Sequence, residues 1–180
     1  MTLELADIAN QVCNRVVSDS SRALTAHLHQ VLFEELGFRG NTENFFDPKN
    51  SFLPYVLERK CGIPITLALV YKLVAGRCGL DVVGLNTPGH FLVRLNLENE
   101  RMIVDCFCGG ELLSAHEVSS RAMMMTGCQE LADSPVIEVA THRQWVTRIL
   151  ANLIHAFSLE NRPKDIAAVS ELHDVLKVAY

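Results

Sequence analysis

Apolar residues recur at helical spacing through the first part of the chain and predict two helices there. The first helix follows a set of apolar positions that repeat every three to four residues: Leu3, Leu5, Ile8, Ala9, Val12 and Val16. Polar residues from Ser18 to Ser21 offer N-caps for a second helix. This helix runs to Leu36, and Gly37 follows it as glycine often follows a helix end. We expect N-terminal helices over residues 1–40.

The segment 41–135 is predicted to combine a buried helix with a small antiparallel sheet. Turn residues dominate 40–50, and a short helix is expected at 51–59. The next helix begins at Pro64, because proline lacks the amide hydrogen that a first helical turn leaves unpaired. Its residues are apolar on nearly every side as far as Arg77. Such a helix is buried on most sides, so we expect it at the centre of an α+β domain.

Three strands are predicted after the central helix, at residues 81–85, 90–95 and 101–107. A loop at 96–99 makes the last two strands a hairpin, in which Leu95 faces Glu100. This register places His90 opposite Asp105 on one face of the sheet. A slip by one residue would turn Asp105 to the other face.

Residues 141–180 are predicted to form a helical hairpin. Before it, Ser114 and Glu117 have the spacing of a capping box and mark the start of another helix. Helices at 141–159 and about 164–178 then follow, and the first carries an apolar stripe: Trp145, Ile149, Leu153 and Phe157. The hairpin resembles one TPR-type repeat, and a stable array needs about three. We therefore expect it to pack on the core of a single domain, 1–180, or on a second subunit in a homodimer.

Composition and charge narrow the classes of partner. The 180 residues are 49% hydrophobic and 21% charged, as in an ordinary globular domain. The net charge is −5, and Arg59-Lys60 is the only adjacent basic pair, so we expect no nucleic-acid partner. We also expect no membrane partner, because no run of about 18 apolar residues is present. The first residues lack the basic region of a secretory signal, which predicts a cytoplasmic protein.

The six cysteines are expected to be free thiols, since a domain of this size folds without disulfides: Cys13, Cys61, Cys78, Cys106, Cys108 and Cys128. Cys106 and Cys108 would point to one face of a strand. With His90 or Cys61 they could form a metal site. The ligand pairs that zinc sites usually show are missing, so we expect neither a metal nor another cofactor.

A series of ordered motifs runs along about residues 30–160. They are Phe38-Arg39-Gly40-Asn41, Phe46-Asp47-Pro48, Asn50-Ser51-Phe52-Leu53, Val56-Leu57-Glu58-Arg59, Gly62-Ile63-Pro64-Ile65-Thr66-Leu67, Pro88-Gly89-His90-Phe91-Leu92-Val93-Arg94 and Asp105 with Gly109-Gly110. Together they resemble the second type of transglutaminase-like core, found in SirB-type bacterial proteins and in an F-box protein of eukaryotes. The resemblance implies a cysteine-peptidase-like α+β core, with the central helix packed on an antiparallel sheet.

The resemblance also implies a catalytic site, from which this sequence departs at the nucleophile. His90 and Asp105 match the family's general base and the carboxylate that orients it. The family's Gly-x-Cys helix start, laid on Gly62 without gaps, puts Pro64 at the nucleophile position. Our leading hypothesis is therefore a non-catalytic, regulatory member that binds a protein or peptide. Its cleft would be lined by His90 and Asp105 together with Asp47, Asn50, Thr66, Asn86 and Arg94.

Two other hypotheses remain open at this stage. Cys61 precedes the central helix and could be the nucleophile of an amide hydrolase or acyl-transferase, with His90 as base and Asp105 as orienter. Thr66, in the first helical turn, and Ser51, the expected N-cap of its helix, are weaker substitutes. Alternatively, the chain is an assembly module that acts through its tail hairpin.

Overall fold

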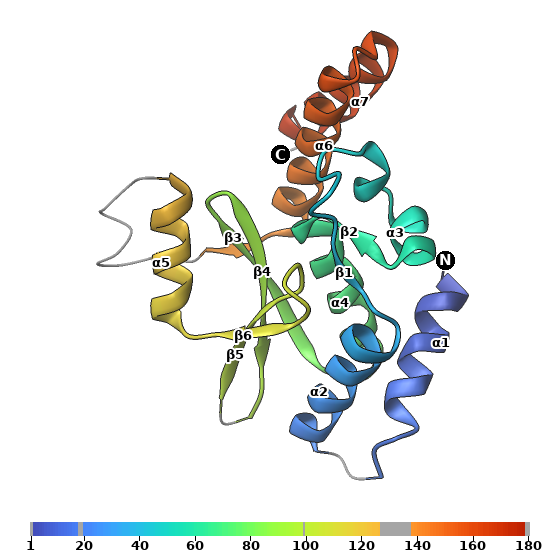
Figure 1. The fold of residues 1–180 in the computed structure, drawn as a ribbon, viewed down its shortest axis with the longest axis vertical. Coiled ribbons are helices and arrows are strands. Elements are labelled where there is room, and N and C mark those ends of the chain that lie inside the picture. The colour runs from blue at the N-terminus through green and yellow to red at the C-terminus, as the bar shows by residue number, and fades with distance from the viewer. Residues whose placement is uncertain (1, 18–19, 99, 127–137, 179–180) are drawn as a thin grey trace.

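A five-stranded antiparallel sheet forms the centre of the protein (Figure 1). The computed structural model describes residues 2–17, 20–98, 100–126 and 138–178. The strands are β3 (Asp81–Thr87), β4 (His90–Asn96), β5 (Arg101–Asp105), β6 (Glu111–Leu113) and β7 (Val139–Ala140). Their order across the sheet is β6-β5-β4-β3-β7. Strands β3 to β6 pair in sequence order, and the chain later returns to add β7 beside β3.

Helices cover both faces of this sheet. They are α1 (Thr2–Cys13), α2 (Ser21–His29), α3 (Leu53–Arg59), α4 (Pro64–Arg77), α5 (Ala115–Thr126), α6 (His142–Leu159) and α7 (Pro163–Val178). Shorter elements complete the chain: η1 (Gln30–Glu35, π-helical), η2 (Pro48–Ser51, 3-10) and the parallel pair β1 (Arg39–Gly40) and β2 (Cys61–Gly62). No helix of the described ranges is long and apolar enough to cross a membrane.

The predicted central helix is confirmed as α4, which lies between the sheet and α1 and α2. Its residues Tyr71 and Val74 are fully buried and join one large core with Val12 of α1 and Phe91 of β4. A smaller core lies on the opposite face, where α5 covers the sheet (Figure 1). It contains Leu85, Leu92, Leu113 and Val118. The α+β architecture with a central helix on an antiparallel sheet is thus as expected.

The predicted register of the β4–β5 hairpin was wrong. Leu95 pairs with Met102 rather than with Glu100. The amide of Leu97 donates to the carbonyl of Glu100, so the loop between the strands is shorter than the predicted loop 96–99. The register thus shifts by two residues along one strand, and side chains on a strand return to the same face every two residues. His90 and Asp105 therefore still share a face, although they are not directly opposite.

Helix ends follow the expected capping chemistry at most positions. The Ser20 hydroxyl accepts a hydrogen bond from the amide of Ala23 at the start of α2. Ser114 and Glu117 form the predicted capping box at α5, with reciprocal bonds of 2.7 and 3.2 Å. The prediction that Ser51 caps α3 was wrong. Ser51 ends η2, and Phe52 takes the cap position without a side-chain bond.

The apolar stripe of the tail is internal and divides between two contacts. Trp145, at the start of α6, is 3% exposed and belongs to the main core beside Phe91. Leu153 and Phe157, further along α6, pack with Val169 of α7 in a separate cluster. Helix α6 therefore joins the sheet domain at one end and α7 at the other.

Two glycines in the turn after β5 give a test with a matched control. Gly109 and Gly110 both have positive φ, +67° and +82°, but a Cβ at Gly110 would lie 2.3 Å from the Phe33 ring, and one at Gly109 would meet nothing. We expect Gly109→Ala to lower the free energy of unfolding by about 1 kcal/mol through backbone strain. Gly110→Ala should cost about 3 kcal/mol, because overpacking adds to the strain. Equal losses in urea unfolding would contradict this account.

Candidate functional site

The N-terminus of α4, where the family pattern expects a nucleophile, carries only buried side chains. Pro64 occupies the first turn, and Ile63 is the cap residue, without a side-chain bond. Thr66 is 1% exposed, and its hydroxyl donates to the carbonyls of Asn50, at 2.7 Å, and Ile63, at 3.1 Å. Thr66 thus ties the helix start to the preceding loop and offers no accessible hydroxyl.

The loop before η2 is held by a buried amide. Asn50 is 1% exposed, and its Nδ2 donates to the carbonyls of Asn44 and Phe45 at 2.8 and 3.0 Å. Its Oδ1 accepts from Nδ2 of Asn41 at 3.0 Å. The sequence predicted that Asn50 lines a binding cleft. In the structure its side chain lies inside the loop and fixes the position of Phe45.

Asp47 is also engaged within this loop. Its carboxylate caps η2 by accepting from the amide of Lys49 at 2.9 Å, and it pairs with Arg59 at 2.8 Å. Burial alone would raise the pKa of Asp47, but the bonds from Arg59 and Lys49 outweigh it and lower the pKa below its usual value. Asp47 therefore stays ionised and supports the loop.

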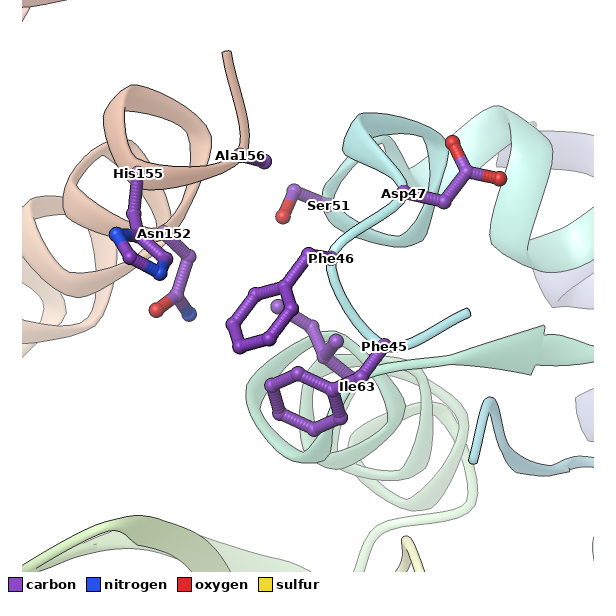
Figure 2. A pocket seen from close by; sticks show the side chains of 8 residues that line it. All are labelled: Phe45, Phe46, Asp47, Ser51, Ile63, Asn152, His155 and Ala156. Atoms are coloured by element: carbon purple, nitrogen blue, oxygen red, sulfur yellow. The ribbon is translucent and has the colours of Figure 1, made fainter. Parts of the chain in front are cut away.

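A cavity between this loop and α6 is lined by aromatic residues that were not predicted from the sequence to form a site. Figure 2 shows Asn152 and His155 projecting from α6 toward Phe45 and Phe46. The two phenylalanines are 38% and 50% exposed, and the Phe46 and His155 rings lie 5.1 Å apart. The enclosed space is only about 30 Å³, roughly one water molecule. The adjacent Phe45-Phe46 in a turn-rich segment was the sequence signal for this surface.

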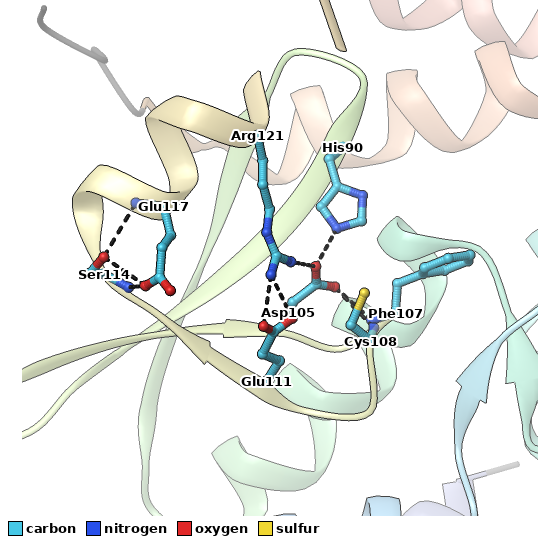
Figure 3. Close-up of polar contacts among 8 residues, drawn as sticks. All are labelled: His90, Asp105, Phe107, Cys108, Glu111, Ser114, Glu117 and Arg121. Atoms are coloured by element: carbon cyan, nitrogen blue, oxygen red, sulfur yellow. Dashed lines mark hydrogen bonds and ion pairs between the residues drawn. The ribbon is translucent and has the colours of Figure 1, made fainter. Parts of the chain in front are cut away.

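His90 and Asp105 are brought into direct contact (Figure 3). His90 begins β4 after a tight turn in which Gly89 has a φ of +69°, and Asp105 ends β5. The His90 Nε2 and Asp105 Oδ2 atoms are 2.8 Å apart, and the side chains are 13% and 1% exposed. A histidine next to a buried carboxylate is held in one orientation, which suits a positioned base and equally a rigid binding wall.

Asp105 is the centre of a wider polar network. Its Oδ1 accepts from the amides of Phe107 and Cys108 at 3.0 and 3.2 Å, and its Oδ2 also accepts from Arg121 at 3.1 Å. Arg121 in turn binds both oxygens of Glu111 at 2.7 Å. Burial acts to raise the pKa of Asp105, but the bonds from His90 and Cys108 prevail and the pKa lies below its usual value.

Cys61 does not join this pair. It lies half-buried in β2, where it pairs with Arg39, and within the described residues no hydrogen bond links its thiol to His90. The Phe107 ring stands 6.1 Å from the His90 ring. The same ring would be 2.5 Å from a Cβ at Gly40, the neighbour of Arg39 in β1. Phe107 thus contacts both the β1–β2 pair and His90.

The predicted arrangement of the CxC cysteines was wrong. Strand β5 ends at Asp105, so Cys106 and Cys108 lie in the following turn, one buried and the other exposed. Ligand atoms of Asp105, Cys108 and Glu111 do lie within 4.8 Å of one another and could hold a metal ion. Arg121 already bridges the two carboxylates and supplies their countercharge. The five cysteines of the described ranges are free thiols, as expected, and Cys128 lies outside them.

The remaining cleft residues, Asn86 and Arg94, lie at different positions along the β3–β4 hairpin, where Asn86 pairs with Phe91 and Arg94 with Val83. The Oδ1 of Asn86, in β3, accepts from Arg148 of α6, and Arg148 also donates to the carbonyl of Thr87 at 3.0 Å. Arg94 lies toward the other end of β4, where its Nε donates to Asn96 at 3.1 Å. Asn86 is thus at the His90 end of the β3–β4 hairpin, and Arg94 is not.

Comparison with known proteins agrees with the fold. The chain is 38% identical to a "UPF0162 protein" of Xylella fastidiosa over 140 residues, which is 76% of this chain and 50% of that protein. It is 33% identical to a "UPF0162 protein" of Vibrio cholerae over 91 residues, 51% of this chain and 34% of that one. It is 34% identical to human "F-box only protein 21" over 80 residues, 44% of this chain and 13% of that one.

The chain thus spans about half the length, or less, of the curated relatives it matches. No solved structure matches it. The family model described as "Transglutaminase-like superfamily" matches residues 1–151, which extends the resemblance of the sequence motifs to the N-terminal helices. The chain belongs to the transglutaminase-like superfamily.

Proposed function

We propose that this chain is a member of its superfamily that binds a protein or peptide without turning it over. The observation that carries the proposal is that no hydrogen bond joins the candidate nucleophile to its base in the described part of the chain. Cys61 has no hydrogen bond to His90, and the helix start beside it offers only the buried Pro64 and Thr66. A base within hydrogen-bond reach, about 3 Å, is a common activator of a cysteine nucleophile.

The surface around His90 supports a binding role. Aromatic rings make a continuous series from α6 to the histidine, with neighbouring centroids between 5.1 and 6.1 Å apart: His155, Phe46, Phe45, Phe107 and His90. Exposed aromatic side chains give large contact area for little conformational entropy and are enriched at protein interfaces. The similarity to a protein named as an F-box protein also supports a role in protein interactions.

Thiol labelling tests the proposal directly. We expect iodoacetamide near pH 6 to label Cys61 slowly, at a rate unchanged within about twofold by His90→Ala, because an unactivated thiol is almost fully protonated there. Cys78 should be slower still, since burial, followed by its contact with Cys13, raises the pKa of Cys78 to about 12. Peptide mapping by mass spectrometry gives each rate separately.

The competing enzyme hypothesis predicts the opposite pattern. Rapid labelling confined to Cys61 and lost in His90→Ala would identify an activated thiolate. Hydrolysis or amide exchange of an acyl substrate that disappears in Cys61→Ser would lead to the same conclusion. Either result would overturn the proposal of binding without turnover.

A further inference from the structure

Arg148 is a half-buried cation whose charge no carboxylate balances among the residues the structure describes. Its Nη1 donates to two neutral acceptors, Oδ1 of Asn86 and the carbonyl of Thr87, and its guanidinium lies 5.6 Å from the centre of the Phe91 ring. Other arginines of the described ranges pair with carboxylates, among them Arg15, Arg22, Arg59, Arg121 and Arg162. Arg148 is therefore held in place with donors left for an anion.

Helix geometry puts Arg148 in line with the aromatic surface. Arg148, Asn152 and His155 are spaced i, i+4 and i+7 along α6, so they lie on one face of the helix. We call these three residues the α6 stripe. No hydrogen bond is found for the side chain of Asn152 among the described ranges, and this side chain, with His155, faces Phe46 across the cavity (Figure 2). The stripe thus carries a cation at one end, a free amide in the middle and paired rings at the other end.

Arg148 is half-buried, and no carboxylate among the described residues neutralises its charge. Removal from water lowers the pKa of Arg148 below its usual value. A guanidinium binds a carboxylate through two parallel hydrogen bonds, which are stronger than bonds between neutral groups. The charge and the geometry of this end of the stripe are therefore complementary to a carboxylate.

We propose that the α6 stripe binds an extended peptide segment in which a glutamate and an aromatic residue are separated by two residues. The glutamate carboxylate binds Arg148, Asn152 bonds to the peptide backbone, and the aromatic ring lies against Phe46. The spacing follows from dimensions. Seven helical residues rise about 10 Å, and three residues of extended chain cover the same length. The inference rests on the proposed binding function and names the partner's chemistry.

A glutamate side chain fits this position better than a C-terminal carboxylate. Arg148 is half-buried against the Phe91 ring, so its partner must reach below the surface. The two methylene groups of glutamate provide that reach, and the peptide backbone stays at the level of Asn152. A terminal carboxylate would have to bring the backbone itself down to the sheet.

Short synthetic peptides provide the test. The probes are acetyl-Glu-Ala-Ala-Phe-amide and acetyl-Phe-Ala-Ala-Glu-amide, their counterparts with Gln in place of Glu, and acetyl-Gln-Ala-Ala-Phe with a free C-terminus. Chemical-shift titration measures each Kd. We expect one of the Glu peptides to bind about tenfold more tightly than its Gln counterpart, the usual worth of a charge-assisted bond.

Variants assign the effect to the stripe. In Arg148→Gln the Glu and Gln peptides should bind equally, whereas Arg148→Lys should keep part of the difference. Arg162→Gln is the matched control, since it removes an exposed arginine of the α6–α7 turn that pairs with Glu160 and Asp165, and it should keep the full difference. The comparison of Glu and Gln peptides on the unaltered protein needs no variant, so it stands even if Arg148→Gln does not fold.

Each other outcome has a definite meaning. Equal binding of Glu and Gln peptides would overturn carboxylate recognition but leave the binding function in place. The inference also fails if neither Glu peptide binds at about 10 mM, a concentration that detects interactions worth only a few kcal/mol. Tighter binding of the peptide with the free C-terminus would overturn the choice of a side chain. Cleavage of any peptide, seen by mass spectrometry and lost in Cys61→Ser, would overturn the proposed function itself.

Discussion

Trp145→Ala is expected to lower the free energy of unfolding by about 3–5 kcal/mol, because it empties a large volume in the main core. The indole lies 4.7 Å, centre to centre, from the Phe91 ring, and its Nε1 donates to the carbonyl of Ile65 at 3.3 Å. A Cβ at Gly84 would approach it to 2.4 Å, so the sheet already uses its smallest residue to admit this side chain.

Val146→Ala is the control for this prediction. Val146 is the next residue of α6 and is 45% exposed, so its truncation should change the free energy of unfolding by less than about 0.5 kcal/mol. Urea unfolding followed by circular dichroism measures both variants, since the chain has no other tryptophan to report by fluorescence. A loss below about 1 kcal/mol for Trp145→Ala would mean that α6 is not anchored to the sheet in this way.

Asp105→Ala is expected to cost about 3 kcal/mol, because it leaves buried donors without an acceptor. The carboxylate accepts from His90, Arg121 and two turn amides. The loss should exceed that of Glu98→Ala, which makes the same change of charge on an exposed loop residue. Similar losses in the two variants would show that the network around Asp105 contributes little.

The cost of replacing Asp105 should also depend on pH. The folded-state pKa of Asp105 is lowered, whereas an aspartate in the unfolded chain titrates near pH 4. The stabilisation is therefore fully present above about pH 4 and is lost as the pH falls through the lower folded-state value. The difference in stability between the natural protein and Asp105→Asn should shrink below about pH 4. A constant difference would contradict the lowered pKa.

Most of the fold could be predicted because its long elements carry clear periodicities. Helix α4 is apolar on nearly every side and lies at the centre of the fold. His90 and Asp105 still share a face because the error in the predicted register was an even number of residues. Strands β6 and β7 and the β1–β2 pair were not predicted. They have two or three residues each, too few for an alternation to be recognised.

The details of the site were less predictable, since they depend on contacts between distant segments. The bond from Arg148 to Asn86 joins residues 62 positions apart, and no local pattern indicates it. The amide of Asn50 bonds to loop carbonyls whose positions follow from turn geometry rather than from spacing. Cys61 was a reasonable candidate from its position before a helix. Whether it meets His90 depends on how two segments far apart in the sequence pack, which its local pattern does not reveal.

The buried amide of Asn50 has a consequence for the cost of binding. It holds the backbone of Phe45 through direct bonds, and Thr66 holds Asn50 in turn. A loop that folds only on meeting its partner loses about 1–2 kcal/mol of conformational entropy for each residue that becomes ordered. In this protein the loop around Phe45 is ordered by internal hydrogen bonds when the protein folds, so binding does not carry that entropy cost. The aromatic surface is therefore preorganised, and a partner has only to order itself.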